Sequence, residues 1–206
     1  MCLVRYIFIT LVALFGSVVA SAQEDMKLLV GADFDTYFDN REYSGSKIGE
    51  SQTLFSSRLT PTVGVEWGER NRLMVGVDMW SNFGDVANAF AKVRPQIYYR
   101  FASPKVRAYA GIFSREEMIG DYSEVFLSDS VRFYDKNLDG LLLQYRDTGG
   151  FVELGVDWDG IYSVEEREKF RIFSAGEYTR QVFTCGYTLS VYHYAGRVGL
   201  AGVVDN

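Results

Sequence analysis

The sequence predicts an all-β protein: an antiparallel up-and-down transmembrane β-barrel of about nine strands, incomplete and therefore an open curved sheet, preceded by a signal peptide. Three observations predict this fold. Apolar and polar residues alternate with a period of two along most of the chain, long and short connections alternate, and the composition suits strands. Among 206 residues, 16% are aromatic, 20 are Gly and only 3 are Pro. Aromatic residues and glycines favour strands and tight turns over helices.

The start of the chain has the features of a secretory signal. Arg5 precedes a short apolar run, and Ala20-Ser21-Ala22 supplies the small side chains of a cleavage site. The run is too short for a transmembrane anchor. We therefore expect residues 1–22 to be a cleaved signal peptide and residues 23–206 to be the N-terminal part of an outer-membrane β-barrel. Removal of the signal leaves Cys185 as the only cysteine, which excludes an internal disulfide.

Nine segments alternate between an apolar and a polar face. No Asp, Glu, Lys or Arg falls on the apolar faces, whereas the polar faces carry many charges. A strand of about 9–11 residues crosses a bilayer at a tilt, which is close to the length of these segments. The predicted strands are residues 27–39, 53–67, 72–80, 92–101, 106–114, 140–146, 151–159, 169–178 and 182–194.

The connections distinguish a membrane barrel from a soluble sandwich, whose strands also alternate. Residues 40–52 and 115–139 are long connections, whereas 68–71 and 147–150 are short. Long outer loops and short periplasmic turns are typical of outer-membrane barrels. Six aromatic residues also fall on apolar faces at strand ends, where interfacial girdles lie. They are Phe38, Trp67, Tyr99, Phe101, Trp158 and Tyr178.

Two prolines disagree with this pattern. Pro61 and Pro95 fall inside predicted strands, and proline cannot donate a hydrogen bond to a neighbouring strand. A closed barrel has no edge strand on which to place them. We therefore expect local β-bulges at both positions.

Two stretches carry a family resemblance: Ser51-Gln52-Thr53-Leu54-Phe55 and Leu141-Leu142-Leu143-Gln144-Tyr145. With the alternating pattern over residues 23–194, they make the chain resemble the uncharacterised porin-like outer-membrane barrels of Gram-negative bacteria. The resemblance implies an outer-membrane location, with membrane lipid and the barrel-assembly machinery as partners. An odd strand number and the end of the sequence, residues 202–206, depart from this group. They predict a chain truncated at its C-terminus.

The charged faces suggest a pore. Strands four and five carry a basic wall, and strands one and seven carry an acidic one, so that a transverse field would select among small solutes. The alternative is that these charges pair and fill a narrow lumen. The predicted pore-lining residues are Asp33, Asp35, Arg58, Lys92, Arg94, Arg100, Arg107, Glu153 and Asp157. The predicted function is porin-like passage of small solutes; the alternative is a non-conducting barrel that displays loops for adhesion or complex assembly.

Other functional classes find little support in the sequence. A net charge of −6 and a pI near 4.9 argue against nucleic acid as a partner. Asp135, Asn137 and Asp139 imitate the start of a calcium loop, but Arg146 stands where a bidentate glutamate belongs. We therefore expect no metal and no cofactor. His193 is the only histidine and is expected to belong to the barrel rim.

No serine stands in a nucleophile-elbow context, so the sequence predicts a protein that is not an enzyme. The long connection 115–139 is the best place for a specific function. Folded inward it would constrict a pore, and folded outward it would present a binding surface. The sequence leaves both arrangements open.

Overall fold

The computed structural model describes residues 26–43, 45, 51–161 and 167–195. The predicted signal peptide and residues 202–206 lie outside this part of the chain. No helix within the described part is long and apolar enough to cross a membrane. Nine strands form one antiparallel sheet: β1 (Lys27–Arg41), β2 (Gln52–Trp67), β3 (Asn71–Asn82), β4 (Lys92–Ala102), β5 (Val106–Ser114), β6 (Asn137–Asp147), β7 (Gly150–Gly160), β8 (Lys169–Arg180) and β9 (Phe183–Tyr194).

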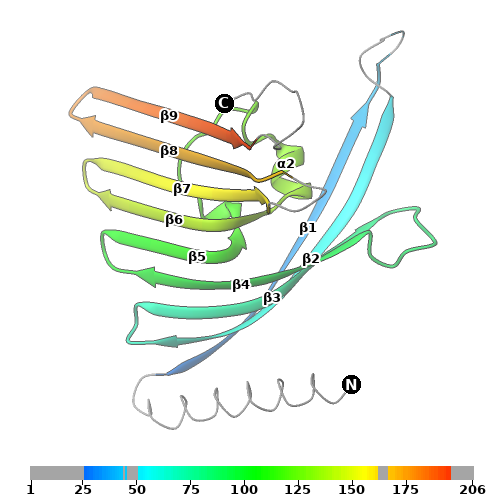
Figure 1. The fold of residues 1–206 in the computed structure, drawn as a ribbon, viewed down its shortest axis with the longest axis horizontal. Helices are drawn as coiled ribbons and strands as arrows, with labels where there is room; N and C mark the ends of the chain where they lie inside the picture. The colour runs from blue at the N-terminus through cyan, green and yellow to red at the C-terminus, as the bar shows by residue number, and fades with distance from the viewer. Residues whose placement is uncertain (1–25, 44, 46–50, 162–166, 196–206) are drawn as a thin grey trace.

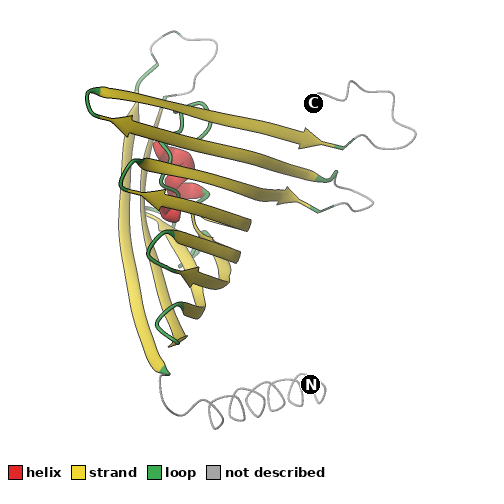
Figure 2. Cartoon of the chain, turned by 90° about the vertical axis from the view of Figure 1, so that its left-hand side faces the viewer, coloured by secondary structure: helices red, strands yellow, loops and turns green. Residues whose placement is uncertain are grey.

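The predicted all-β fold is confirmed. Each strand pairs with the next in sequence order, in the order β1 to β9, and the strand bounds follow the predicted ones closely. The sheet is strongly curved and open (Figures 1 and 2). Within the described residues β1 and β9 form its two edges and do not pair with each other, as predicted.

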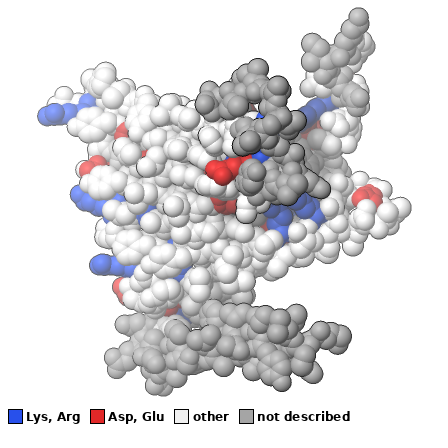
Figure 3. Space-filling model, viewed as in Figure 1, with Lys and Arg blue, Asp and Glu red and all other residues white. Residues whose placement is uncertain are grey.

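The two faces of the sheet have the polarity of a membrane barrel. Outward-facing apolar side chains are exposed, among them Val30 at 79% and Leu154 at 49%. Charged side chains on the concave face are buried, with Arg58 at 1% and Glu153 at 0%. In Figure 3 the surface formed by the strands carries few charged atoms, which gather toward the strand ends. A soluble protein shows the opposite arrangement, so the outward face is suited to lipid.

This polarity leads to a prediction for Leu143, which lies on the outward face near the middle of β6 and is 52% exposed. An arginine on the lipid face at mid-bilayer depth costs about 2–4 kcal/mol. Leu143→Arg is therefore expected to reduce folding into lipid vesicles strongly, while Leu143→Ala folds. Urea titration of vesicle-folded protein measures the difference, and equal stability of the two variants would contradict a lipid-facing position.

The predicted bulges at the prolines are wrong. The pairing of β2 with β3 keeps one register on both sides of Pro61 and only lacks paired residues there, between Leu59 and Thr62. Pro95 pairs with Val77 of β3 and lies beyond the end of the β4–β5 pairing, which begins at Ile97. Each proline therefore lies where a hydrogen-bond ladder is interrupted or absent. In the described residues the only register shift is in the β7–β8 pair, between Trp158 and Gly160.

The connections alternate in length as predicted and divide the sheet into two ends. Residues 68–70, 103–105, 148–149 and 181–182 form the short-turn end. Residues 42–51, 83–91, 115–136 and 161–168 connect strands at the opposite, long-loop end. Aromatic residues of the predicted girdle pack against neighbouring aromatic rings at both ends of the sheet. Trp67 packs on Tyr99 at the short-turn end, and Phe38 packs on Phe55 at the long-loop end.

Residues 115–136, here called the plug segment, fold against the concave face. The segment contains a 3₁₀ helix η1 (Arg115–Glu117) and an α-helix α2 (Asp129–Tyr134), which begin at the capping side chains of Ser114 and Ser128. Both helices lie inside the curve of the sheet (Figure 2). The structure thus decides the question that the sequence left open: this connection folds inward.

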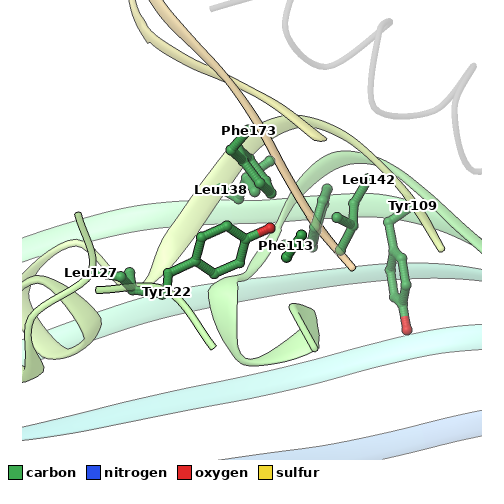
Figure 4. Close-up of a cluster of buried hydrophobic side chains, with 8 residues drawn as sticks. Tyr109, Phe113, Tyr122, Leu127, Leu138, Leu142 and Phe173 are labelled. Atoms are coloured by element: carbon green, nitrogen blue, oxygen red, sulfur yellow. The ribbon is translucent and has the colours of Figure 1, made fainter. Parts of the chain in front are cut away.

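The plug segment supplies part of the only extensive buried apolar cluster in the described chain. Tyr122 and Leu127 of the segment pack with side chains from β5, β6 and β8, as Figure 4 shows. At its other end Phe133 stacks on Tyr37 of β1, with ring centroids 5.1 Å apart. The segment therefore spans the concave face and links strands that are far apart in the sheet. The strand residues of the cluster are Tyr109, Phe113, Leu138, Leu142, Phe173 and Ala175.

Candidate functional site

Glu153 of β7 anchors the first half of the plug segment. Its fully buried carboxylate accepts hydrogen bonds from the backbone N–H groups of Ile119 and Gly120, at 2.9 and 2.8 Å. The Tyr122 hydroxyl and the Gln144 amide donate to it at 2.8 and 3.0 Å. Burial, followed by the nearby Glu153 carboxylate, raises the pKa of the Tyr122 phenol, which therefore stays protonated as a donor. These four donors stabilise a charge that burial would otherwise disfavour.

Two cations anchor the remainder of the plug segment. Arg115 is 4% exposed and binds both Asp157 of β7 and Asp135, the latter at 2.8 Å. Lys136 is 3% exposed and binds Asp35 of β1 at 2.5 Å. Burial by itself lowers the pKa of both cations, but the carboxylates around them outweigh it and hold each pKa above its ordinary value. Both ends of the plug segment are thus fixed to the sheet by ion pairs, one fully buried at Arg115 and one part-buried at Lys136.

A third buried pair lies beneath helix α2. Arg58 of β2 donates to Asp78 of β3 at 2.7 Å, and both side chains are almost completely buried. The Arg58 guanidinium also lies between the rings of Trp80 and Phe133, 5.1 and 5.0 Å from their centroids. The Nε and Nη2 atoms of Arg58 are buried without a hydrogen-bond partner among the described residues, and the two rings supply the cation–π contacts of this guanidinium.

Strand alternation puts the nine predicted pore-lining residues on the concave face. The structure does not arrange them as two facing walls across open space. Arg94 of the basic wall binds Asp135 at 3.0 Å and Asp139 at 3.2 Å. Asp35, Asp157 and Glu153 of the acidic wall bind the plug segment instead. Among the described residues Asp33, Lys92, Arg100 and Arg107 form no ion pair.

The partners of these charges had no distinguishing pattern in the sequence. Arg115 and Lys136 lie in a connection without periodicity, and its length was the only signal that marked it. Asp135 and Asp139, which imitate a calcium loop in the sequence, both bind Arg94. No group of three or more His, Cys, Asp or Glu side chains in the described part of the chain is placed to hold a metal ion.

A cavity opens at the long-loop end, between the starts of β4 and β6 and the end of β7. Its volume is about 570 Å³. Three cations and four carboxylates line this mouth cavity, together with Trp158 and Ile161. The charged residues are Lys92, Arg94, Arg115, Asp135, Asp139, Asp157 and Asp159.

Trp158 connects this cavity with an aromatic stack on the outward face. Its ring stacks on Phe170 of β8 at 4.9 Å, and Phe170 stacks on the imidazole of His193 in β9 at 4.6 Å. Phe170 and His193 are directly paired across the two strands. The only imidazole in the sequence therefore lies on the lipid-facing side of the sheet, at its long-loop end. Trp158, Phe170 and His193 are here called the rim stack.

The rim stack supplies a base but no protein nucleophile. No Ser, Thr or Cys side chain of the described residues forms a hydrogen bond with His193. Cys185 is on the same face of β9 but pairs with Tyr178 near the short-turn end. Of the groups that can accept a proton near neutral pH, imidazole is the commonest in enzymes.

A comparison with protein families gives one match: the family described as Lipid A 3'-O-deacylase-type, over residues 20–198. Neither the curated proteins nor the solved structures contain a significant match to the chain. This family is an enzyme family associated with the outer membrane, so three predictions are wrong: the porin-like resemblance, the function in solute passage or adhesion, and the absence of enzymatic activity. Barrel-strand stretches such as residues 51–55 and 141–145 reflect a fold that many functions share, which explains the error. Because the match covers most of the sequence, the chain belongs to the Lipid A 3'-O-deacylase-type family.

Proposed function

We propose that this protein hydrolyses an acyl ester of lipid A in the outer leaflet of the outer membrane, at the rim stack. The observation that carries the proposal is the position of His193, an imidazole on the lipid-facing side at the long-loop end. Long loops of outer-membrane barrels lie outside the cell, so this end faces the outer leaflet. A substrate held there by its acyl chains can bring an ester to the imidazole without leaving the membrane.

The chemistry needs one base and one water molecule. His193 takes a proton from water as the water oxygen bonds to the ester carbonyl carbon. The bond between that carbon and the sugar oxygen then breaks, and the imidazolium returns the proton to the leaving oxygen. The products are a free fatty acid and a lipid A molecule with one acyl chain fewer. Trp158 and Phe170 provide an apolar surface for the acyl chains beside the base.

The proposal includes the route to the membrane. Export would use the signal peptide over residues 1–22, and the barrel-assembly machinery would insert the sheet. The plug segment fills the concave side with paired charges, so the proposed reaction takes place at the outward rim and requires no passage through the sheet.

His193→Ala is expected to lower the rate of deacylation at least about 100-fold, because a positioned general base typically contributes 10²–10⁴-fold. The measurement is mass spectrometry of lipid A after incubation with the membrane-embedded protein, together with assay of released fatty acid. Cys185→Ala is the matched control, since it changes the same face of β9 at the other end. Unchanged deacylation by His193→Ala would exclude His193 as the base, and no deacylation by the unmodified protein would refute the proposed function.

A further inference from the structure

Three cations gather at the start of β8, next to the rim stack. Arg167 precedes the strand, and Lys169 and Arg171 point from it to the concave side, opposite in direction to Phe170. All three side chains are half-buried. No carboxylate of the described residues lies within ion-pair distance of any of them. Arg167, Lys169 and Arg171 are here called the rim cations.

Aromatic rings hold the rim cations in place. Arg167 and Lys169 lie over the ring of Tyr194, 5.0 and 5.7 Å from its centroid. Arg171 lies between Tyr192 and Phe126 of the plug segment, at 5.5 and 4.8 Å. The two tyrosine rings are themselves stacked, with centroids 6.4 Å apart. Within the described part of the chain, the contacts that order these charges are the faces of aromatic rings.

Among the described residues, no carboxylate occupies the hydrogen-bond donors of these cations. A guanidinium that stacks on a ring contacts it with its flat face, so its N–H groups point away in the plane of the group. Such a fork matches the oxygens of a phosphate, and a hydrogen bond between ions is about twice as strong as one between neutral groups. Asp157, which pairs with Arg171 across the strands, is already bound by Arg115. Asp159 is the other carboxylate whose charge acts on Arg171, and among the described residues it forms no ion pair with it.

We propose that the rim cations bind a phosphate group of the glycolipid substrate, an inference that rests on the proposed function. Lipid A is a phosphorylated and acylated disaccharide. The rim stack and the rim cations lie on opposite faces of the same strand ends, since Phe170 is the residue between Lys169 and Arg171. A glycolipid with its acyl chains on the outward stack extends its phosphorylated head over the rim to the cations. The phosphate contact then sets which ester reaches His193.

Binding, measured separately from hydrolysis, tests this inference. The protein in detergent micelles carries His193→Ala to prevent turnover, and its affinity is compared for lipid A and for the same lipid after enzymatic removal of its phosphates. We expect the phosphorylated form to bind at least about 10-fold more tightly, with inorganic phosphate as a weak competitor. The triple variant Arg167→Gln, Lys169→Gln, Arg171→Gln is expected to bind both forms equally. Arg180→Gln, at the opposite end of β8, is the matched control and is expected to keep the preference.

Each outcome bears on one proposal. A preference for phosphorylated lipid that survives in the triple variant would overturn the role of the rim cations, as would equal binding of both lipids by the unmodified cluster. Stronger competition by inorganic phosphate than by the phosphorylated lipid would assign the site to a free anion instead and overturn the inference. Folding of the triple variant is checked by heat-modifiable migration, and single Arg171→Gln replaces it if it fails to fold. A phosphate preference without any deacylation by the native protein would refute the proposed function and leave the phosphate site in place.

Discussion

Replacing Glu153 with Ala is expected to detach the first half of the plug segment and to lower the free energy of unfolding by about 3–5 kcal/mol. A buried donor left without an acceptor costs about 1–3 kcal/mol. The change removes the acceptor of the Ile119 and Gly120 N–H groups and of the Tyr122 hydroxyl. Glu153 is the largest single source of polar contacts between the sheet and this part of the segment.

Two measurements follow this change. Urea unfolding of the vesicle-folded protein gives the loss of stability, and limited trypsin digestion at Arg132, an exposed residue of helix α2, reports release of the segment. Glu153→Gln is the matched control, because it keeps an acceptor oxygen and most of the volume; it is expected to lose about half as much stability. Cleavage at Arg132 that is equally slow in Glu153→Ala and in the unmodified protein would show that the apolar cluster alone holds the segment.

Breaking the buried pair of Arg115 and Asp157 is expected to have an effect of similar size. Removal of one partner from a buried ion pair costs about 3–5 kcal/mol, because the other charge remains buried without compensation. Asp157→Leu leaves Arg115 with Asp135, which is 44% exposed and also binds Arg94. It also removes the acceptor of the Asp139 N–H group, which donates to Asp157 at 3.1 Å.

The double variant Arg115→Met, Asp157→Leu separates charge from packing. Replacement of both partners by apolar side chains of similar volume is often close to neutral. We expect the double variant to recover most of the stability that Asp157→Leu loses, in the same urea titration. Additive losses from the two single changes would mean that the pair contributes nothing through its charges, and would place the stabilisation in other contacts of each residue.

The interior of this protein shows why charges on alternating strands do not by themselves identify a pore. The same residues that form basic and acidic walls in the sequence pattern, such as Arg94 and Asp157, are paired with partners that lie far away in the chain. Lys136 reaches Asp35 across one hundred and one positions of sequence. A charge on a strand has the same pattern whether it faces water or a buried counter-ion, so the alternation does not distinguish the two cases.

The sequence by itself determined the strands, their order and their two faces. Alternation of apolar and polar residues with a period of two indicates a β-strand with one apolar and one polar face. A shift of the strand pairing by one residue would turn every charged side chain of β2 or β7 toward lipid. Short turns of two or three residues then leave antiparallel neighbours as the only pairing. The open sheet followed from the same reasoning, since it requires only the direction and number of the strands.

Only the tertiary structure decided where the plug segment lies and what surrounds His193. Residues 115–136 have no periodicity, and their position depends on contacts with β1, β7 and β8 that form after the sheet curves. In the sequence, no pattern distinguishes His193 from the other residues expected at the barrel rim. Its stacking on Phe170, and the cations on the other side of the same strand end, result from the register of β8 against β9. Local patterns specify backbone conformation because each residue acts on its neighbours, whereas a site depends on distant residues that meet only in the folded chain.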